Sequence, residues 1–142
     1  RVGRVIDINT DMLEGIFALR GSPVPVIAPL GAGTDGLTYN INADFAAAKV
    51  AIALQADELI YLTDQKAIWD AEKNPISWVD ERGLQALIHS HVVTGGMLAK
   101  TQTVMMALNN GVKTVRILHA EDAVSSLFSR DIGTSCVKTF FP

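Results

Sequence analysis

The sequence predicts an α/β fold in which a mainly parallel sheet is sandwiched between helices. Short apolar runs alternate with helix-forming stretches along all 142 residues, and this alternation is typical of strand–helix–strand units. Hydrophobic residues make up 49% of the chain and charged residues only 19%, against about 25% charged in an average domain. Both observations favour one globular domain with a substantial buried core.

The first predicted elements precede a proline-bounded apolar run. Residues 2–8 alternate loosely and could form a strand. A capping cluster at 9–11 comes before a helix over 12–19, whose apolar positions share one face. Residues 24–29, VPVIAP, are apolar and lie between prolines. This run predicts a short buried strand that ends at Pro29.

The chain is organised around the loop and helix that follow this strand. Residues 30–36 contain three glycines, which let backbone approach a ligand without interference from Cβ atoms. Asn40, Asn42 and Asp44 then cluster before an alanine-rich helix over 46–54. In open α/β sheets, ligands bind beyond the carboxyl ends of strands and at helix N-termini. The pattern therefore predicts a ligand site here.

The remaining elements continue the alternation to the end of the chain. They are a strand over 58–62, a turn cluster at 71–75, helices over 79–91 and 97–108, a strand over 112–118, a helix over 120–128 and a closing strand over 132–137.

Charge and cysteine content narrow the function classes. The net charge of −3 leaves no basic footprint, which argues against a nucleic-acid partner. The single Cys136 cannot form an internal disulfide and favours a reducing compartment. No apolar stretch approaches the roughly 20 residues of a membrane span, and there is no signal-peptide pattern. We expect a cytoplasmic protein or, because the chain begins with Arg1, a part of one.

Three motifs carry a family resemblance. They are YNINAD at 39–44, LTDQKAIWD at 62–70 and GGMLAK at 95–100. In this order they resemble the carboxyl-terminal half of the amino acid kinase family, and within it the acetylglutamate kinases. The resemblance implies a carbamate kinase-like fold. It also implies that residues 1–142 form the nucleotide-binding, carboxyl-terminal lobe, with the amino-terminal lobe absent.

The resemblance further implies a phosphotransferase that is inactive as the isolated fragment. ATP would phosphorylate the side-chain carboxylate of N-acetyl-L-glutamate in arginine biosynthesis. The partners would be these two small molecules, the missing amino-terminal half or a partner chain, and further copies in a homo-oligomer. No carboxylate cluster in the sequence suggests a dedicated metal cage, so we expect Mg²⁺ to arrive on the ATP phosphates.

Two other functions stay open. The chain could be the amino acid kinase-like regulatory domain of an acetylglutamate synthase, which binds arginine rather than ATP. It could also be a non-catalytic nucleotide-binding module. The combination of Asn40, Asn42, Asp44 and Lys100 favours the kinase over the synthase domain, whereas arginine binding without ATP binding would reverse that choice.

Lys100 and Asp44 are the predicted catalytic residues. Lys100 follows Gly95-Gly96 near a helix N-terminus, where the helix dipole and backbone N–H groups favour phosphate. A flexible ammonium can follow charge as it moves during phosphoryl transfer. The resemblance implies that Asp44 orients this lysine. The other reading makes Asp44 a first-turn carboxylate that stabilises its helix by about 0.3–1 kcal/mol.

The resemblance also assigns two binding sets. Asn40 and Asn42, whose amides can donate and accept hydrogen bonds, would bind the acceptor substrate. The predicted nucleotide-binding residues are Thr63, Asp64, Gln65, Lys66, Ala67, Ile68, Trp69, Val92, Val93, Thr94, Gly95 and Gly96. Ala67 stands where the family usually has glycine, so we expect backbone strain if that position needs a positive φ.

Overall fold

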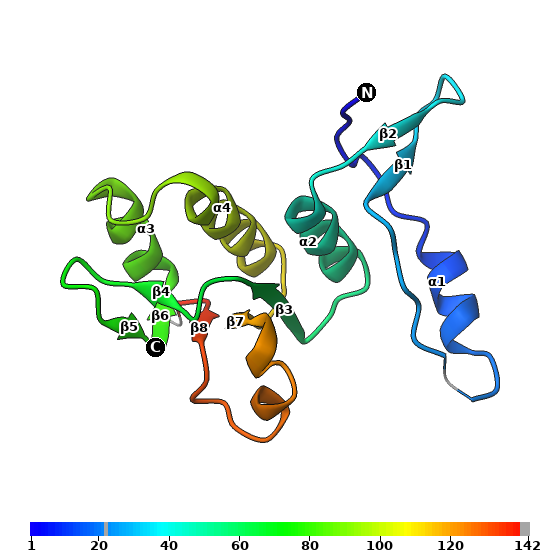
Figure 1. Ribbon diagram of the computed structural model, residues 1–142. Coiled ribbons are helices and arrows are strands. Elements are labelled where there is room, and N and C mark those ends of the chain that lie inside the picture. The colour runs from blue at the N-terminus through cyan, green and yellow to red at the C-terminus, as the bar shows by residue number, and fades with distance from the viewer. Residues whose placement is uncertain (22, 140–142) are drawn as a thin grey trace.

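The computed structural model describes residues 1–21 and 23–139 (Figure 1). Its main sheet has four strands in the order β3-β7-β8-β6. These are β3 (Glu58–Thr63), β7 (Thr114–His119), β8 (Thr134–Val137) and β6 (Trp78–Asp80). The pairs β3–β7 and β8–β6 are parallel, whereas β7 and β8 are antiparallel. The sheet is therefore mixed but mainly parallel, which confirms the predicted α/β class.

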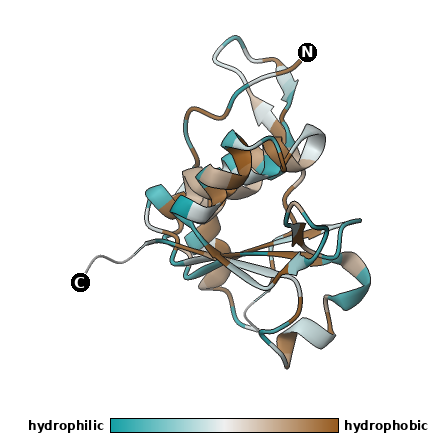
Figure 2. Cartoon of the chain, turned by 90° about the vertical axis from the view of Figure 1, so that its left-hand side faces the viewer, coloured by the Kyte–Doolittle hydropathy of each residue, from teal (hydrophilic) through white to brown (hydrophobic). Residues whose placement is uncertain are grey.

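Three α-helices lie on one side of this sheet (Figures 1 and 2). They are α2 (Ala43–Ala53), α3 (Glu81–His89) and α4 (Gly95–Asn109). Two short 3-10 helices, η1 (Ala120–Asp122) and η2 (Ser125–Leu127), lie on the other side. None of the helices in the described ranges has both the length and the hydropathy needed to cross a membrane.

The core forms where α2 and α4, which lie side by side, pack against β3 and β7 of the sheet. Val104, Ala107 and Leu108 of α4 are fully buried, and their i, i+3, i+4 spacing places them on one helical face. Fully buried Val115 and Ile117 of β7 belong to the same hydrophobic cluster. This packing fixes the first turns of α2 and α4 relative to the carboxyl end of β3.

Side-chain caps form at the start of three helices, one of them in the predicted capping cluster at 9–11. The Asn9 side chain accepts a hydrogen bond from the Met12 N–H at 3.1 Å and begins α1 (Thr10–Phe17). Asn42 accepts from the Phe45 N–H at 3.0 Å at the start of α2. The helix predicted over 79–91 begins later, because Asp80 caps it through the Gly83 N–H at 2.8 Å. Its first predicted residue, Val79, belongs instead to β6.

The amino-terminal region differs most from prediction. Residues 24–29 form no strand, and Val24 and Val26 are 86% and 97% exposed. Three prolines between 23 and 29 remove backbone donors, and no strand of the described chain pairs with this run. Residues 2–8 form only an isolated bridge, from Val2 to Asn40.

The predicted glycine loop is part of a β-hairpin instead. Its first residues form β1 (Leu30–Ala32), which pairs antiparallel with β2 (Thr38–Asn40). A second hairpin, β4 (Ile68–Trp69) with β5 (Pro75–Ile76), encloses the predicted turn cluster.

The helix predicted over 120–128 is wrong, because a buried arginine reorganises the segment. Arg116 of β7 is only 3% exposed. Its guanidinium donates to the backbone carbonyls of Ser126, Ser129 and Ile132, each at 3.2 Å. These carbonyls turn toward Arg116, and the segment folds into η1 and η2.

Candidate functional site

A cavity of about 530 Å³ opens at the carboxyl end of β3, beside the first turns of α2 and α4. This volume lies within the range of about 300–1,000 Å³ that is usual for small-molecule sites. Most of the predicted site residues line it. They are Asp44, Thr63, Asp64, Gln65, Trp69, Val92, Val93, Thr94, Gly96 and Lys100.

An ion pair between Lys100 and Asp44 joins the two helices at this cavity. Lys100 Nζ lies 2.7 Å from Asp44 Oδ2, and the two side chains are 12% and 30% exposed. Each residue lies in the first turn or two of its helix, so the core packing of α2 against α4 sets their separation. The pair places an ammonium and a carboxylate, both with restricted motion, at the cavity wall.

Tyr61 of β3 supports this ion pair from within the protein. The Lys100 ammonium lies 4.8 Å from the centre of the Tyr61 ring, a distance typical of a cation–π contact. The Tyr61 hydroxyl lies 2.9 Å from the Asp44 carbonyl oxygen and 3.0 Å from Thr103 Oγ1. Thr103 Oγ1 in turn donates to the Lys100 carbonyl at 2.7 Å. One phenol therefore connects β3, α2 and α4 around the pair.

The environment of Tyr61 favours its protonated form. Burial, together with the nearby Asp44 carboxylate, raises the pKa of Tyr61 to about 12. The hydroxyl thus stays a hydrogen-bond donor throughout the neutral and mildly alkaline range. Neither Tyr61 nor Thr103 was predicted from the sequence as a site residue. The sequence does contain a signal for Tyr61, which is a tyrosine within an otherwise apolar strand. A buried tyrosine usually needs a hydrogen-bond partner for its hydroxyl.

The N-terminus of α4 is open toward the cavity. Its N-cap residue, Thr94, makes no side-chain cap hydrogen bond, whereas Asn42 caps α2. Gly96 and Met97, in the first turn of α4, line the cavity. Uncapped N–H groups at the positive end of a helix of 15 residues favour an anionic ligand group, and Lys100 adds a full positive charge on the same wall.

Part of the lining is apolar. Val92, Val93, Met97 and Trp69 contribute to it, and Trp69 is 37% exposed. Aromatic and aliphatic side chains of this kind bind flat or apolar ligand groups. The cavity therefore offers a cationic group and apolar side chains together, which suits a molecule that has both an anionic and an aromatic part.

Six of the predicted site residues do not line this cavity. They are Asn40, Asn42, Lys66, Ala67, Ile68 and Gly95. Asn40 is exposed in β2. Asn42 uses its side-chain oxygen as a cap and lines a separate cavity of about 300 Å³. Ile68 is fully buried, and its N–H donates to Thr134 Oγ1 at 2.8 Å.

The condition for the strain expected at Ala67, a positive φ, is not met. In the described ranges, only three residues other than glycine have a positive φ, and Ala67 is not among them. Its side chain is 3% exposed, so the methyl group is part of the packing beneath the 64–69 loop. The described residues also contain no group of three or more His, Cys, Asp or Glu side chains that could hold a metal ion.

Comparison with known proteins gives both sequence and structural matches. A sequence model of the amino acid kinase family matches residues 1–119. Over 142 residues the chain is 37% identical to the acetylglutamate kinase of Ruegeria pomeroyi, covering 92% of this chain and 49% of that protein. The chain thus spans about half the length of such relatives.

Two solved structures show the same fold. One is an N-acetylglutamate synthase from Neisseria gonorrhoeae complexed with coenzyme A and L-arginine. It matches with a TM-score of 0.88 and 28% identity, over 99% of this chain and 33% of that one. The other is carbamate kinase from Giardia lamblia bound to AMP-PNP, with a TM-score of 0.64 and 22% identity, over 78% of this chain and 37% of that one. The predicted carbamate kinase-like fold is confirmed.

Proposed function

Because the chain belongs to the amino acid kinase family, as its motifs predicted, we propose that it supplies the ATP-binding part of an acetylglutamate kinase. The observation that carries this proposal is the Lys100–Asp44 pair, 2.7 Å apart, at a cavity that also has apolar lining residues. The relative from Ruegeria pomeroyi supports the choice of activity within the family.

In this proposal, ATP supplies the phosphoryl group, and the protein supplies orientation and charge. The adenosine lies against the apolar lining residues such as Trp69 and Val92, and the phosphates lie against Lys100 and the α4 N-terminus. Lys100 stabilises negative charge that develops on the phosphates during transfer. Asp44 holds the ammonium in place. Mg²⁺ would arrive bound to the ATP phosphates, because Mg²⁺ commonly uses substrate phosphates and few protein ligands.

The acceptor, N-acetyl-L-glutamate, would bind on the side of Asn40 and Asn42. The rest of its site would come from sequence outside this chain, since the chain spans only 49% of the Ruegeria pomeroyi enzyme. We therefore expect the chain alone to bind ATP without transferring phosphate. Phosphorylation of the acceptor side chain would form an acyl phosphate, in which a carboxylate oxygen of the substrate bonds to the transferred phosphorus and ADP leaves.

A second function has specific support. The structure of the Neisseria gonorrhoeae synthase, which matches with a TM-score of 0.88, contains L-arginine. The chain could therefore be the regulatory domain of such a synthase. The Lys100–Asp44 pair favours the kinase, because an arginine site needs no cation at this position.

Calorimetry on the purified chain separates these functions. The kinase proposal expects heat of binding with MgATP and none with L-arginine, and the synthase proposal expects the reverse. Hydroxylamine traps acyl phosphates as hydroxamates. No hydroxamate should form from the chain alone with MgATP and N-acetyl-L-glutamate, but it should form once the missing half is supplied. L-arginine binding without ATP binding would overturn the proposal.

A further inference from the structure

The Lys100 ammonium is held on two sides by partners of different kinds. Asp44 Oδ2 lies 2.7 Å from Nζ, and the centre of the Tyr61 ring lies 4.8 Å from it. An ammonium carries three N–H donors. Asp44 takes one, and the ring face covers a second side. Lys100 lines the cavity, whereas Tyr61 does not. The side of the ammonium that is left over is therefore the one that a ligand in the cavity can reach.

The ring that covers the ammonium is itself fixed. Tyr61 is 4% exposed and belongs to the main hydrophobic cluster. Its hydroxyl lies within hydrogen-bond distance of the Asp44 carbonyl oxygen on α2 and of Thr103 Oγ1 on α4. The strand that carries Tyr61, β3, pairs along its whole length with β7. The ammonium therefore takes its position from the ring, and not the reverse.

An aromatic face suits this role better than a second carboxylate would. It attracts a cation through the negative face of its π-system without adding a full negative charge. Lys100 and Asp44 already balance each other's formal charge. A second carboxylate beside them would make the group net negative, and it would repel phosphates. Tyr61 can therefore restrain the ammonium without weakening its attraction for an anionic ligand.

We propose that Tyr61 is a positioning residue that increases the affinity of the site for the phosphates of its nucleotide. The ring and Asp44 together hold the ammonium in one orientation before the ligand arrives, so little motion is lost on binding. Ordering a free lysine at that moment would weaken binding roughly 2- to 13-fold. Because Tyr61 does not line the cavity, its effect passes through Lys100 to the phosphates and should not extend to the base or the sugar. The inference rests on the proposed function for the identity of the ligand.

The test compares two ligands and two substitutions at Tyr61 in the full 142-residue chain. MgATP carries the phosphates, whereas adenosine has the same base and sugar and no phosphate. Tyr61→Leu removes the ring, and Tyr61→Phe keeps the ring and removes only the hydroxyl. Titrations followed by NMR measure the Kd of each ligand for each protein, including weak binding of adenosine.

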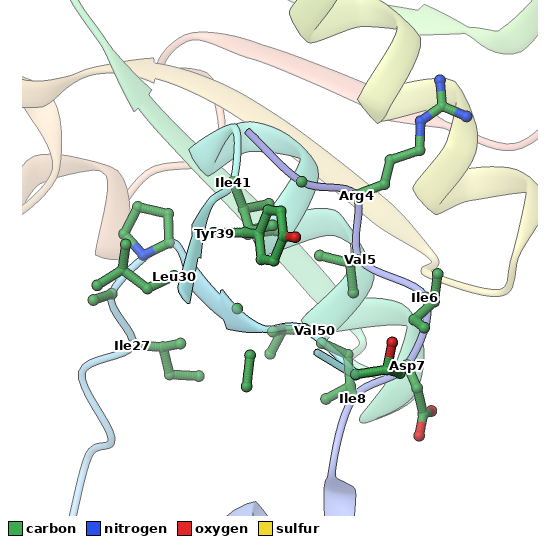
Figure 3. Close-up of a pocket in the computed structure, with 18 of the residues that line it drawn as sticks. Arg4, Val5, Ile6, Asp7, Ile8, Ile27, Leu30, Tyr39, Ile41 and Val50 are labelled. Carbon is green, nitrogen blue, oxygen red and sulfur yellow. The ribbon is translucent and has the colours of Figure 1, made fainter. Parts of the chain in front are cut away.

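Tyr39→Leu is the matched control, because Tyr39 is the other tyrosine of the chain. Its hydroxyl also has a partner, since it donates to Asp35 Oδ2 at 2.8 Å. Tyr39 lines a separate cavity of about 430 Å³ in the amino-terminal region, together with Val5 and Ile41 (Figure 3). Loss of this phenol should leave the binding of both ligands unchanged.

We expect Tyr61→Leu to weaken MgATP binding roughly 2- to 13-fold and to leave adenosine binding unchanged. Tyr61→Phe should bind both ligands as the unaltered chain does. NMR also gives a readout that needs no ligand, because protons over an aromatic face resonate upfield. The ε-methylene signals of Lys100 should lie upfield of those of Lys113, whose ion pair is exposed. Tyr61→Phe should keep this difference, and Tyr61→Leu should remove it.

Three results would overturn this inference while the proposed function stands. The first is unchanged MgATP affinity in Tyr61→Leu. The second is an equal loss of affinity for MgATP and adenosine, which would mean that Tyr61 only supports the fold. The third is an equal loss of MgATP affinity in Tyr61→Phe and Tyr61→Leu, which would assign the effect to the hydroxyl. Failure of the unaltered chain to bind MgATP would instead refute the proposed function, and this inference with it.

Discussion

Replacing Tyr61 with phenylalanine isolates the hydroxyl that ties the Lys100–Asp44 pair to β3. The variant keeps the ring beneath the ammonium at 4.8 Å and removes only the oxygen that lies 2.9 Å from the Asp44 carbonyl and 3.0 Å from Thr103 Oγ1. Because Tyr61 is 4% exposed, water cannot easily replace the lost partner.

The expected cost follows from these contacts. A typical hydrogen bond contributes about 0.5–1.5 kcal/mol, and a buried group left without a partner adds to that loss. We expect Tyr61→Phe to lower the free energy of unfolding by about 1–2 kcal/mol at pH 8. Tyr61→Leu should cost more, because it also removes the ring and leaves a cavity. Urea denaturation of the purified variants measures both values.

The pH dependence gives a more specific signature. Burial raises the pKa of Tyr61 to about 12 in the folded chain, against an ordinary value of 10.0 for tyrosine. The folded state therefore holds this proton more tightly than the unfolded state does, and stability falls as pH rises from about 10 to about 12. Complete ionisation of Tyr61 would lower the free energy of unfolding by about 2–3 kcal/mol, since one pKa unit corresponds to about 1.36 kcal/mol. Phenylalanine has no proton to lose.

The stability advantage of the unaltered chain over Tyr61→Phe should therefore shrink above pH 10. Other ionisable groups are present in both proteins and cancel in the difference. An advantage that stays constant from pH 8 to pH 11.5, or a Tyr61→Phe chain as stable as the original at pH 8, would refute this account of the hydroxyl.

Two further outcomes follow from burial. Ala67→Gly should not tighten MgATP binding in calorimetry, because Ala67 has no positive φ that glycine would relieve. It should lower the free energy of unfolding by about 0.5–1 kcal/mol, because Ala67 is 3% exposed. Tighter binding would mean that Ala67 does strain the backbone. Cys136 is fully buried, and burial raises the pKa of its thiol to about 12. At pH 8 it should react with a disulfide reagent only when the chain unfolds, and rapid reaction of the folded chain would contradict that.

Elements set by local chemistry could be predicted from the sequence. The Asn9 and Asn42 caps mark two helix starts, and the apolar runs of β3 and β7 became neighbouring parallel strands. The Lys100–Asp44 contact followed from the family motifs, because each residue lies near the start of a helix that the sequence indicates.

Elements that depend on distant partners could not be predicted in this way. Residues 24–29 have the composition of a buried strand but lack a neighbouring strand in the described chain, so they stay exposed. The 120–128 segment has a helical pattern, yet buried Arg116 binds the Ser126 carbonyl from the neighbouring strand. The role of Tyr61 depends on α2 and α4 meeting above β3, which no local pattern encodes.

The most direct measurement is calorimetric titration of MgATP into the chain and two lysine variants. Lys100→Met removes the ammonium at the cavity and leaves Asp44 unpaired. Lys113→Met is a matched control, since Lys113 forms a 2.6 Å pair with Asp57 at side chains 76% and 83% exposed. A hydrogen bond to a charged group contributes about 1.5–3 kcal/mol, or roughly 10- to 100-fold in Kd. The account predicts a loss of this size for Lys100→Met and no change for Lys113→Met. Equal affinity of the two variants, or no ATP binding by the unaltered chain, would contradict it.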